Sequence, residues 1–265
     1  MVSSDAYFLV FHGSRDCRTQ AAADNLRQLL VAKYQSMNIL TQQNYLAKDL
    51  ITFKHKNGFP LKQFKPPLIE IAALELADLT LSESLINFAH QASRYGIKQI
   101  KVVPLFLVPG VHVTEDIPAE IALANEQIDY QVQIKLSPYL GKYSGIVPHL
   151  SRKFAELSGK TRILIAHGSR LSAGAKYYQG LASQLGAKLA YWSTDPKFSD
   201  LITAQITSGS RKIAILPYFL FPGKITEAIA AEVARLQSQY PQVKLFLGKP
   251  LGATEAVAEL IAKEV

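Results

Sequence analysis

Polar side chains follow three apolar segments of strand length in the first half of the chain. His12 ends the first segment, Glu75 ends the second, and His112 lies just past the third, before a helix. The carboxyl ends of parallel strands lie along one edge of a sheet, where open α/β sheets bind their ligands, so we expect these side chains to lie close together. Two imidazoles and a carboxylate can hold a divalent metal in an open site. They can also accept protons near neutral pH, because the reference pKa of histidine is about 6.5.

Each of these positions also has a purely structural interpretation. His12 and His112 can be hydrogen-bonded residues that simply end a strand or precede a helix, and Glu75 can be a solvent-facing acid. Ser14 and Arg15 lie at a turn before a helix, where backbone N–H groups and a guanidinium are suited to an anion. Structural capping is the alternative for these two residues.

The chain contains an internal repeat. Residues 7–15 (YFLVFHGSR) return as residues 162–170 (RILIAHGSR), and residues 103–110 (VPLFLVPG) return as residues 216–223 (LPYFLFPG). In each case an apolar segment ends in turn-forming residues. We infer a duplicated unit, with one copy in residues 1–158 and the other in residues 159–265.

The second copy keeps the histidine but loses the other two polar groups. His167 stands in the repeated motif, whereas Lys224 or Ile225 replaces the second histidine, depending on where a one-residue gap is placed. Residues 191–195 contain no clear counterpart of the glutamate. A copy that keeps fold residues and loses polar ones is typical of a scaffold, so we expect a structural or peripheral role for His167.

Strand and helix patterns alternate along the chain, which predicts α/β halves, each with a parallel sheet of about four strands flanked by helices, and a cleft between them. In the first half we expect strands at 6–11, 68–74, 99–107 and 130–136, and helices at 19–37, 81–95, 114–125 and 147–157. In the second half we expect strands at 162–166, 188–192, 212–219 and 243–247, and helices at 174–185, 200–208, 226–239 and 253–263.

The first half contains an insertion. His12 and Pro104 are 92 positions apart, whereas His167 and Pro217 are 50 apart, so about 42 extra residues lie in the first half. Most of them fall in residues 38–67, a basic stretch with five lysines and one acidic residue. This segment is either a solvated loop or a lid that attracts anions.

Composition limits the class of protein. The chain has 265 residues, 48% of them hydrophobic and 19% charged, which suits one large or two modest cores. Cys17 is the single cysteine, so the chain can form neither an intrachain disulfide nor a cysteine zinc cage. The sequence shows no leader pattern, and no apolar run approaches the roughly 20 residues that a membrane-spanning helix needs. We therefore expect a soluble cytoplasmic protein.

The net charge of +8 suits nucleic acid, an anionic membrane surface or a polyacidic small molecule. The sequence lacks a helix-turn-helix, zinc-finger or aromatic RNA-binding signature. We therefore expect neither nucleic acid nor a membrane as the partner.

Taken in order, the motifs resemble the class II chelatases of the sirohydrochlorin type. They are residues 11–15 (FHGSR), 74–77 (LELA) and 103–107 (VPLFL), running on to His112 and residues 116–118 (DIP). This family comprises the cobaltochelatases of anaerobic cobalamin synthesis and the ferrochelatases of siroheme synthesis. The resemblance covers nearly the whole chain, in the long form with two halves.

The resemblance implies insertion of Fe²⁺ or Co²⁺ into sirohydrochlorin, without ATP and without an organic cofactor. It assigns metal binding and catalysis to His12, Glu75 and His112. Leu105 and Phe106 are candidates to line the pocket for the ring, with core packing as the alternative. Because the second half lacks two of the three polar groups, we expect one site per chain, in the cleft and formed by the first half. Two halves complete a cleft within one chain, so we expect a monomer.

Two other functions are compatible with parts of this pattern. Histidine-dependent phosphatases place an arginine directly before the catalytic histidine, whereas Phe11 stands there in this chain. A non-catalytic carrier of a tetrapyrrole or a metal would need the same binding residues but would not turn over. The choice between iron and cobalt stays open, because both ions accept the same ligands.

Overall fold

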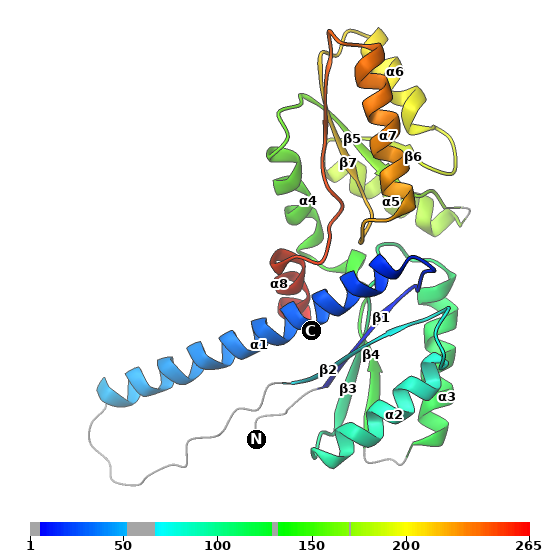
Figure 1. Cartoon of the computed structure of the whole chain (residues 1–265). Helices are drawn as coiled ribbons and strands as arrows, with labels where there is room; N and C mark the ends of the chain where they lie inside the picture. The colour runs from blue at the N-terminus through cyan, green and yellow to red at the C-terminus, as the bar shows by residue number, and fades with distance from the viewer. Residues whose placement is uncertain (1–5, 52–66, 129–131, 170) are drawn as a thin grey trace.

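Two parallel sheets of the same topology form the framework of the molecule (Figure 1). A computed structural model describes residues 6–51, 67–128, 132–169 and 171–265, with side chains except in residues 38–51. The first sheet has the order β2-β1-β3-β4 and the second the order β6-β5-β7-β8, and all neighbouring strands are parallel. This agreement of strand order is the structural counterpart of the sequence repeat.

The bounds of the elements follow the predicted alternation. The strands are β1 (Ala6–Phe11), β2 (Leu68–Ala73), β3 (Gln99–Pro104), β4 (Gln133–Leu136), β5 (Thr161–Ala166), β6 (Lys188–Tyr191), β7 (Lys212–Pro217) and β8 (Lys244–Leu247). The α-helices are α1 (Cys17–Ile51), α2 (Leu81–Arg94), α3 (Ile117–Gln127), α4 (Ile146–Ala155), α5 (Ser172–Gln184), α6 (Phe198–Thr207), α7 (Lys224–Gln239) and α8 (Glu255–Glu264). A π-helix (His112–Asp116) precedes α3, and a 3₁₀ turn (Leu140–Lys142) precedes α4.

The central strand β1 shows why the apolar runs become buried strands. All six of its residues are buried, and successive side chains enter different cores. Leu9 lies in the core that the two halves share, whereas Phe8 packs in the core under α2 and α3. Helices cover both faces of such a sheet, so every residue of the strand is apolar.

The helices that end the two halves are exchanged. α8 follows β8 of the second sheet but packs against α1 of the first half, where Lys33 pairs with Glu259 at 3.4 Å (Figure 1). α4 follows β4 of the first sheet but packs against β7 of the second, and the guanidinium of Arg162 lies over the Phe154 ring at 5.5 Å. One hydrophobic cluster therefore contains residues from both halves, which fixes them to each other.

Several strands are two or three residues shorter than expected, and two helices differ in ways that concern the site or the insertion. The first helix runs on to Ile51 instead of ending at residue 37, because residues 38–51 contain no glycine or proline to break it. This part of the basic stretch is thus helical, and residues 52–66 lie outside the described residues. The expected helix at 114–125 begins instead with the π-turn at His112, and the Thr114 hydroxyl donates to the carbonyl of Gly110 at 3.2 Å.

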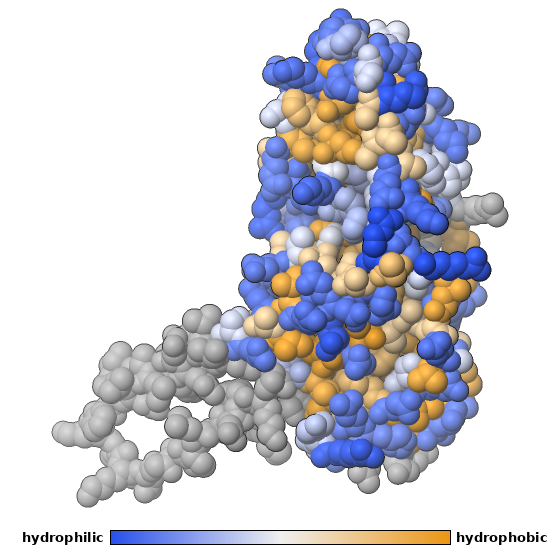
Figure 2. Space-filling model, viewed as in Figure 1, coloured by the Kyte–Doolittle hydropathy of each residue, from blue (hydrophilic) through white to orange (hydrophobic). Residues whose placement is uncertain are grey.

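The described helices do not have the features of membrane-spanning segments. Hydrophilic side chains cover much of the face seen in Figure 2, with smaller hydrophobic areas in both halves. Within the described part of the chain, none of the helices combines the length and the apolar character that crossing a membrane requires.

Candidate metal centre

The β1–β2 ladder brings His12 and Glu75 side by side. Its hydrogen bonds continue past the strands, from the N–H of Leu74 to the carbonyl of Phe11 at 2.8 Å and from the N–H of Glu75 to the carbonyl of His12 at 3.0 Å. Gly13 turns the chain away with φ +95°, and a Cβ at this position would lie 2.1 Å from the carbonyl oxygen of Glu75. Only a glycine therefore allows the two loops to approach so closely.

His112 reaches the same edge from the far side of β1. The N–H of Leu105 donates to the carbonyl of Val10 at 2.7 Å, and the chain then turns at Gly110 and starts the π-helix with His112. The rings of His12 and His112 meet edge to face, with centroids 4.7 Å apart. The Phe106 ring lies beside both, 5.9 Å from His112 and 6.4 Å from His12.

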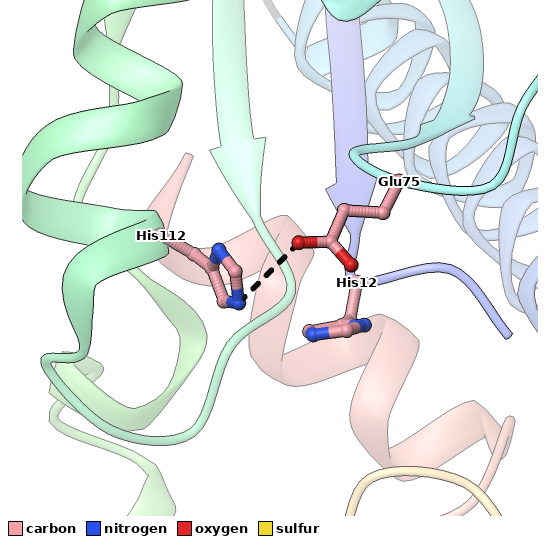
Figure 3. A group of neighbouring side chains, drawn as sticks. All are labelled: His12, Glu75 and His112. Carbon is pink, nitrogen blue, oxygen red and sulfur yellow. Dashed lines mark ion pairs between the residues drawn. The ribbon is translucent and has the colours of Figure 1, made fainter.

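The three predicted side chains form a single group. One ligand atom from each of His12, Glu75 and His112 lies within 4.8 Å of the others, and the side chains converge as Figure 3 shows. His112 Nε2 and Glu75 Oε1 are 4.0 Å apart, which exceeds a hydrogen bond. Two adjacent ligand atoms that each lie about 2.1 Å from a metal are closer to each other than these two atoms are. The group would therefore have to contract by about 1 Å around an ion. It is the one group of three or more His, Cys, Asp or Glu side chains of this kind within the described ranges.

The site is open to solvent. The side chain of Glu75 is 50% exposed and that of His112 is 31% exposed, and His12 is exposed as well. An open set of two nitrogen ligands and one oxygen ligand leaves room for a second reactant to reach a bound ion.

Hydrogen bonds occupy Nδ1 of both histidines. His112 Nδ1 lies 2.7 Å from Asp116 Oδ2, and His12 Nδ1 lies 3.1 Å from the carbonyl oxygen of Gly13. A carbonyl or carboxylate oxygen can only accept, so Nδ1 carries the hydrogen in each ring. The lone pair of each imidazole is therefore on Nε2.

The other predicted residues have different environments. The hydroxyl of Ser14 accepts the N–H of Asp16 at 3.0 Å, which is a turn contact, and Arg15 is exposed. Phe106 lies beside the two histidine rings, as given above. Leu105 is only 4% exposed and belongs to the core shared by the halves, so almost none of its side chain is left for a ligand.

Sequence reasoning missed the polar contacts of Asp116 and of Arg18. Asp116 was noted only as part of a motif, although its spacing of four residues from His112 was a usable signal. Arg18 at the start of α1 pairs with Asp16 at 2.5 Å and with Glu227 at the start of α7. The Arg18 guanidinium lowers the pKa of the Asp16 carboxyl to about 2, and the pairing with Glu227 joins the two halves beside the loop that carries Ser14.

The second half repeats the backbone of the site but keeps only one of the three polar side chains, His167. Its ladder also continues past the strands, from the N–H of Trp192 to the carbonyl of Ala166 and from the N–H of Ser193 to the carbonyl of His167, both at 2.9 Å. The Phe219 ring lies 6.5 Å from the His167 ring, as Phe106 lies near His12. Ser193 therefore stands where the first half has its glutamate.

Comparisons with known proteins agree with this architecture. The family model described as CbiX matches residues 61–157 and again residues 161–265. A sirohydrochlorin ferrochelatase from Priestia megaterium is 24% identical over 77% of this chain and 79% of its own length. A sirohydrochlorin cobaltochelatase from Methanocaldococcus jannaschii is 35% identical over 23% of this chain and 39% of its own length.

A solved structure shows the same fold over nearly the whole chain. SirB from Bacillus subtilis with Fe³⁺ superposes with a TM-score of 0.70 and 20% identity, covering 98% of this chain and 94% of that one. The two matches to the family model together span most of the sequence. The first covers β2, β3 and β4 of the first sheet, and the second covers all four strands of the second sheet. The chain therefore belongs to the CbiX family of class II chelatases, in the form with two repeated halves.

Proposed function

We propose that this protein is a sirohydrochlorin chelatase that inserts Fe²⁺ or Co²⁺ into sirohydrochlorin at one site, formed by His12, Glu75 and His112. The observation that carries the proposal is the convergence of these three side chains at an exposed sheet edge, within 4.8 Å of one another. The Priestia megaterium ferrochelatase and the Methanocaldococcus jannaschii cobaltochelatase among its relatives support the choice of substrate.

The ligand set suits a metal that must be released again. Imidazole and carboxylate bind Fe²⁺ and Co²⁺, whereas a cage of cysteines would retain the ion. Metallation of a tetrapyrrole also removes two protons from pyrrole nitrogens. A histidine or glutamate that gives up the ion can accept such a proton, so the same three side chains serve both steps.

The surroundings suit the organic substrate. Phe106 offers an aromatic ring next to both histidines, where an apolar macrocycle would lie. Sirohydrochlorin is a polycarboxylate, and the net charge of +8 favours its approach. All three ligands come from one chain, so the proposal requires no second subunit.

Anaerobic incubation of the protein with excess sirohydrochlorin and either Fe²⁺ or Co²⁺, followed by absorbance, tests the proposal. We expect many turnovers per chain for at least one metal. The Glu75→Gln variant should lose activity, and the His90→Gln variant, changed at an exposed position on α2, should keep it. Stoichiometric binding of the pigment without a rate above background would contradict the proposal and favour a carrier.

A further inference from the structure

We propose that Asp116 is a positioning residue that holds the His112 ring with Nε2 directed at the metal. The inference rests on the proposed function of this site and adds a residue to it. Its basis is the 2.7 Å contact between Asp116 Oδ2 and His112 Nδ1, together with the π-helix in which both residues lie.

The contact determines which nitrogen can bind a metal. An ionised carboxylate only accepts hydrogen bonds, so the hydrogen of the neutral ring lies on Nδ1 and the lone pair lies on Nε2. Nε2 of His112 is also the atom that faces Glu75, 4.0 Å from Oε1 (Figure 3). Asp116 thus selects both the tautomer and the direction of the ring.

The backbone holds Asp116 in place for this role. The N–H of Ile117 donates to the carbonyl of His112, which closes the π-turn around the pair. Ile117 itself is fully buried in the core under α2 and α3, and Pro118 lies in the first turn of α3. The carboxylate therefore projects from an anchored segment, although its side chain is 45% exposed. π-turns of this kind are frequent at functional sites.

The duplicated half shows that the fold does not need this pair. The π-turn adds one residue to the first half, and the pattern of buried residues aligns Ile117 with Ile229. Asp116 therefore corresponds to Ala228, and His112 to Lys224 or Ile225. α7 starts directly at Lys224 as a regular α-helix. The polar pair and the π-turn occur together only in the half that carries the other two ligands.

The two histidines are therefore not equivalent. The Nδ1 hydrogen of His12 is donated to a neutral backbone carbonyl, whereas that of His112 is donated to a carboxylate. A carboxylate partner raises the basicity of a metal-binding imidazole more than a carbonyl does, and loss of such partners typically weakens metal binding by about 10- to 100-fold. We infer that His112 contributes the stronger of the two nitrogen ligands.

Co²⁺ titration of the full chain without tetrapyrrole, followed by visible absorbance, tests this role. We expect the Asp116→Asn variant to bind Co²⁺ about 10- to 100-fold more weakly than the wild type. The Asp116→Glu variant should recover part of this loss. The matched control is Glu115→Gln, at the exposed neighbouring position, which should bind as the wild type does.

The tautomer of His112 provides a readout that a merely structural role would not change. Nitrogen NMR of the wild type should show the hydrogen on Nδ1, and the Asp116→Asn variant should show a mixture. Wild-type affinity in Asp116→Asn, or a wild-type hydrogen on Nε2, would overturn the inference. A wild type that binds Co²⁺ through His112 but never metallates sirohydrochlorin would instead contradict only the proposed function.

Discussion

Glu75 and Ser193 occupy the same backbone position in the two halves. The N–H of each donates to the carbonyl of the histidine that follows the central strand, at 3.0 Å to His12 and 2.9 Å to His167. The Ser193 hydroxyl donates to that same carbonyl at 2.6 Å, whereas the Glu75 carboxylate turns towards His112. One backbone arrangement thus supports a candidate metal site in one half and a local hydrogen bond in the other.

Gly13 allows this arrangement, and its replacement should disturb the site. In Gly13→Ala the new Cβ would meet the Glu75 carbonyl oxygen, so we expect a loss of stability and weaker Co²⁺ binding. Gly96 also has a positive φ, but a Cβ there would meet open space. The Gly96→Ala control should lose only about 1–2 kcal/mol from backbone strain and keep its Co²⁺ affinity. Denaturant unfolding and Co²⁺ titration measure the stability and the Co²⁺ affinity of both variants. Equal losses in Gly13→Ala and Gly96→Ala would show that the close approach of Gly13 to Glu75 does not matter for the site.

A pair of tyrosines should stabilise the contact between the halves. The Tyr218 hydroxyl donates to the Leu107 carbonyl at 3.0 Å and lies 2.8 Å from the hydroxyl of Tyr177, which donates to the Gly141 carbonyl at 2.6 Å. Burial raises the pKa of Tyr177 to about 12, so its hydroxyl keeps its hydrogen at neutral pH.

We expect Tyr218→Phe to lower the free energy of unfolding by about 1–3 kcal/mol, because the partly buried carbonyl of Leu107 loses its donor. Tyr178→Phe is the matched control, since Tyr178 is equally buried and its hydroxyl makes no hydrogen bond to the residues described. Urea unfolding of both variants measures the difference. A Tyr218→Phe protein as stable as Tyr178→Phe would show that the hydrogen bonds contribute nothing.

His149 predicts a dependence of stability on pH. The residue is 7% exposed, and its Nε2 has no hydrogen-bond partner within the described part of the chain. Burial lowers the pKa of His149, and the nearby Lys153 and Arg152 lower it further. The unfolded chain therefore binds a proton at His149 more tightly than the folded chain does. The contribution of the neutral His149 to the free energy of unfolding is fully present above the unfolded pKa of roughly 6.5 and is lost as the pH falls below that value.

The His149→Phe variant should lack this component of the pH dependence. We expect the stability of the wild type to decline relative to this variant between roughly pH 7.5 and 5.5, measured by urea unfolding at each pH. His90→Gln, at an exposed histidine, should follow the wild type. A constant difference between wild type and His149→Phe across this range would mean that burial does not depress the pKa.

The local pattern was sufficient to predict the sheets and the meeting of the three candidate ligands. β1 was predicted with its observed bounds because all six residues are apolar and buried. His12, Glu75 and His112 were expected to meet because parallel strands end on one edge, and the structure places their ligand atoms together. Both inferences depend only on strand periodicity and direction.

Features set by long-range packing could not be predicted in the same way. The apolar face of α8 shows that the helix is buried, but not that it packs against α1 instead of the sheet it follows. The π-turn at His112 depends on a shift of one residue in the hydrogen-bond register, which leaves no mark on the apolar periodicity. The spacing of four residues between His112 and Asp116 was a signal for their contact, but the π-turn that holds the pair emerged only from the structure.

The most direct test of a single chelatase site in the first half compares metal insertion by three alanine variants under limiting metal. The account predicts that His12→Ala and His112→Ala each slow metallation of sirohydrochlorin by roughly 100-fold or more, while His167→Ala retains the wild-type rate. Loss of activity in His167→Ala alone, with the other two unaffected, would contradict it and place the site in the second half.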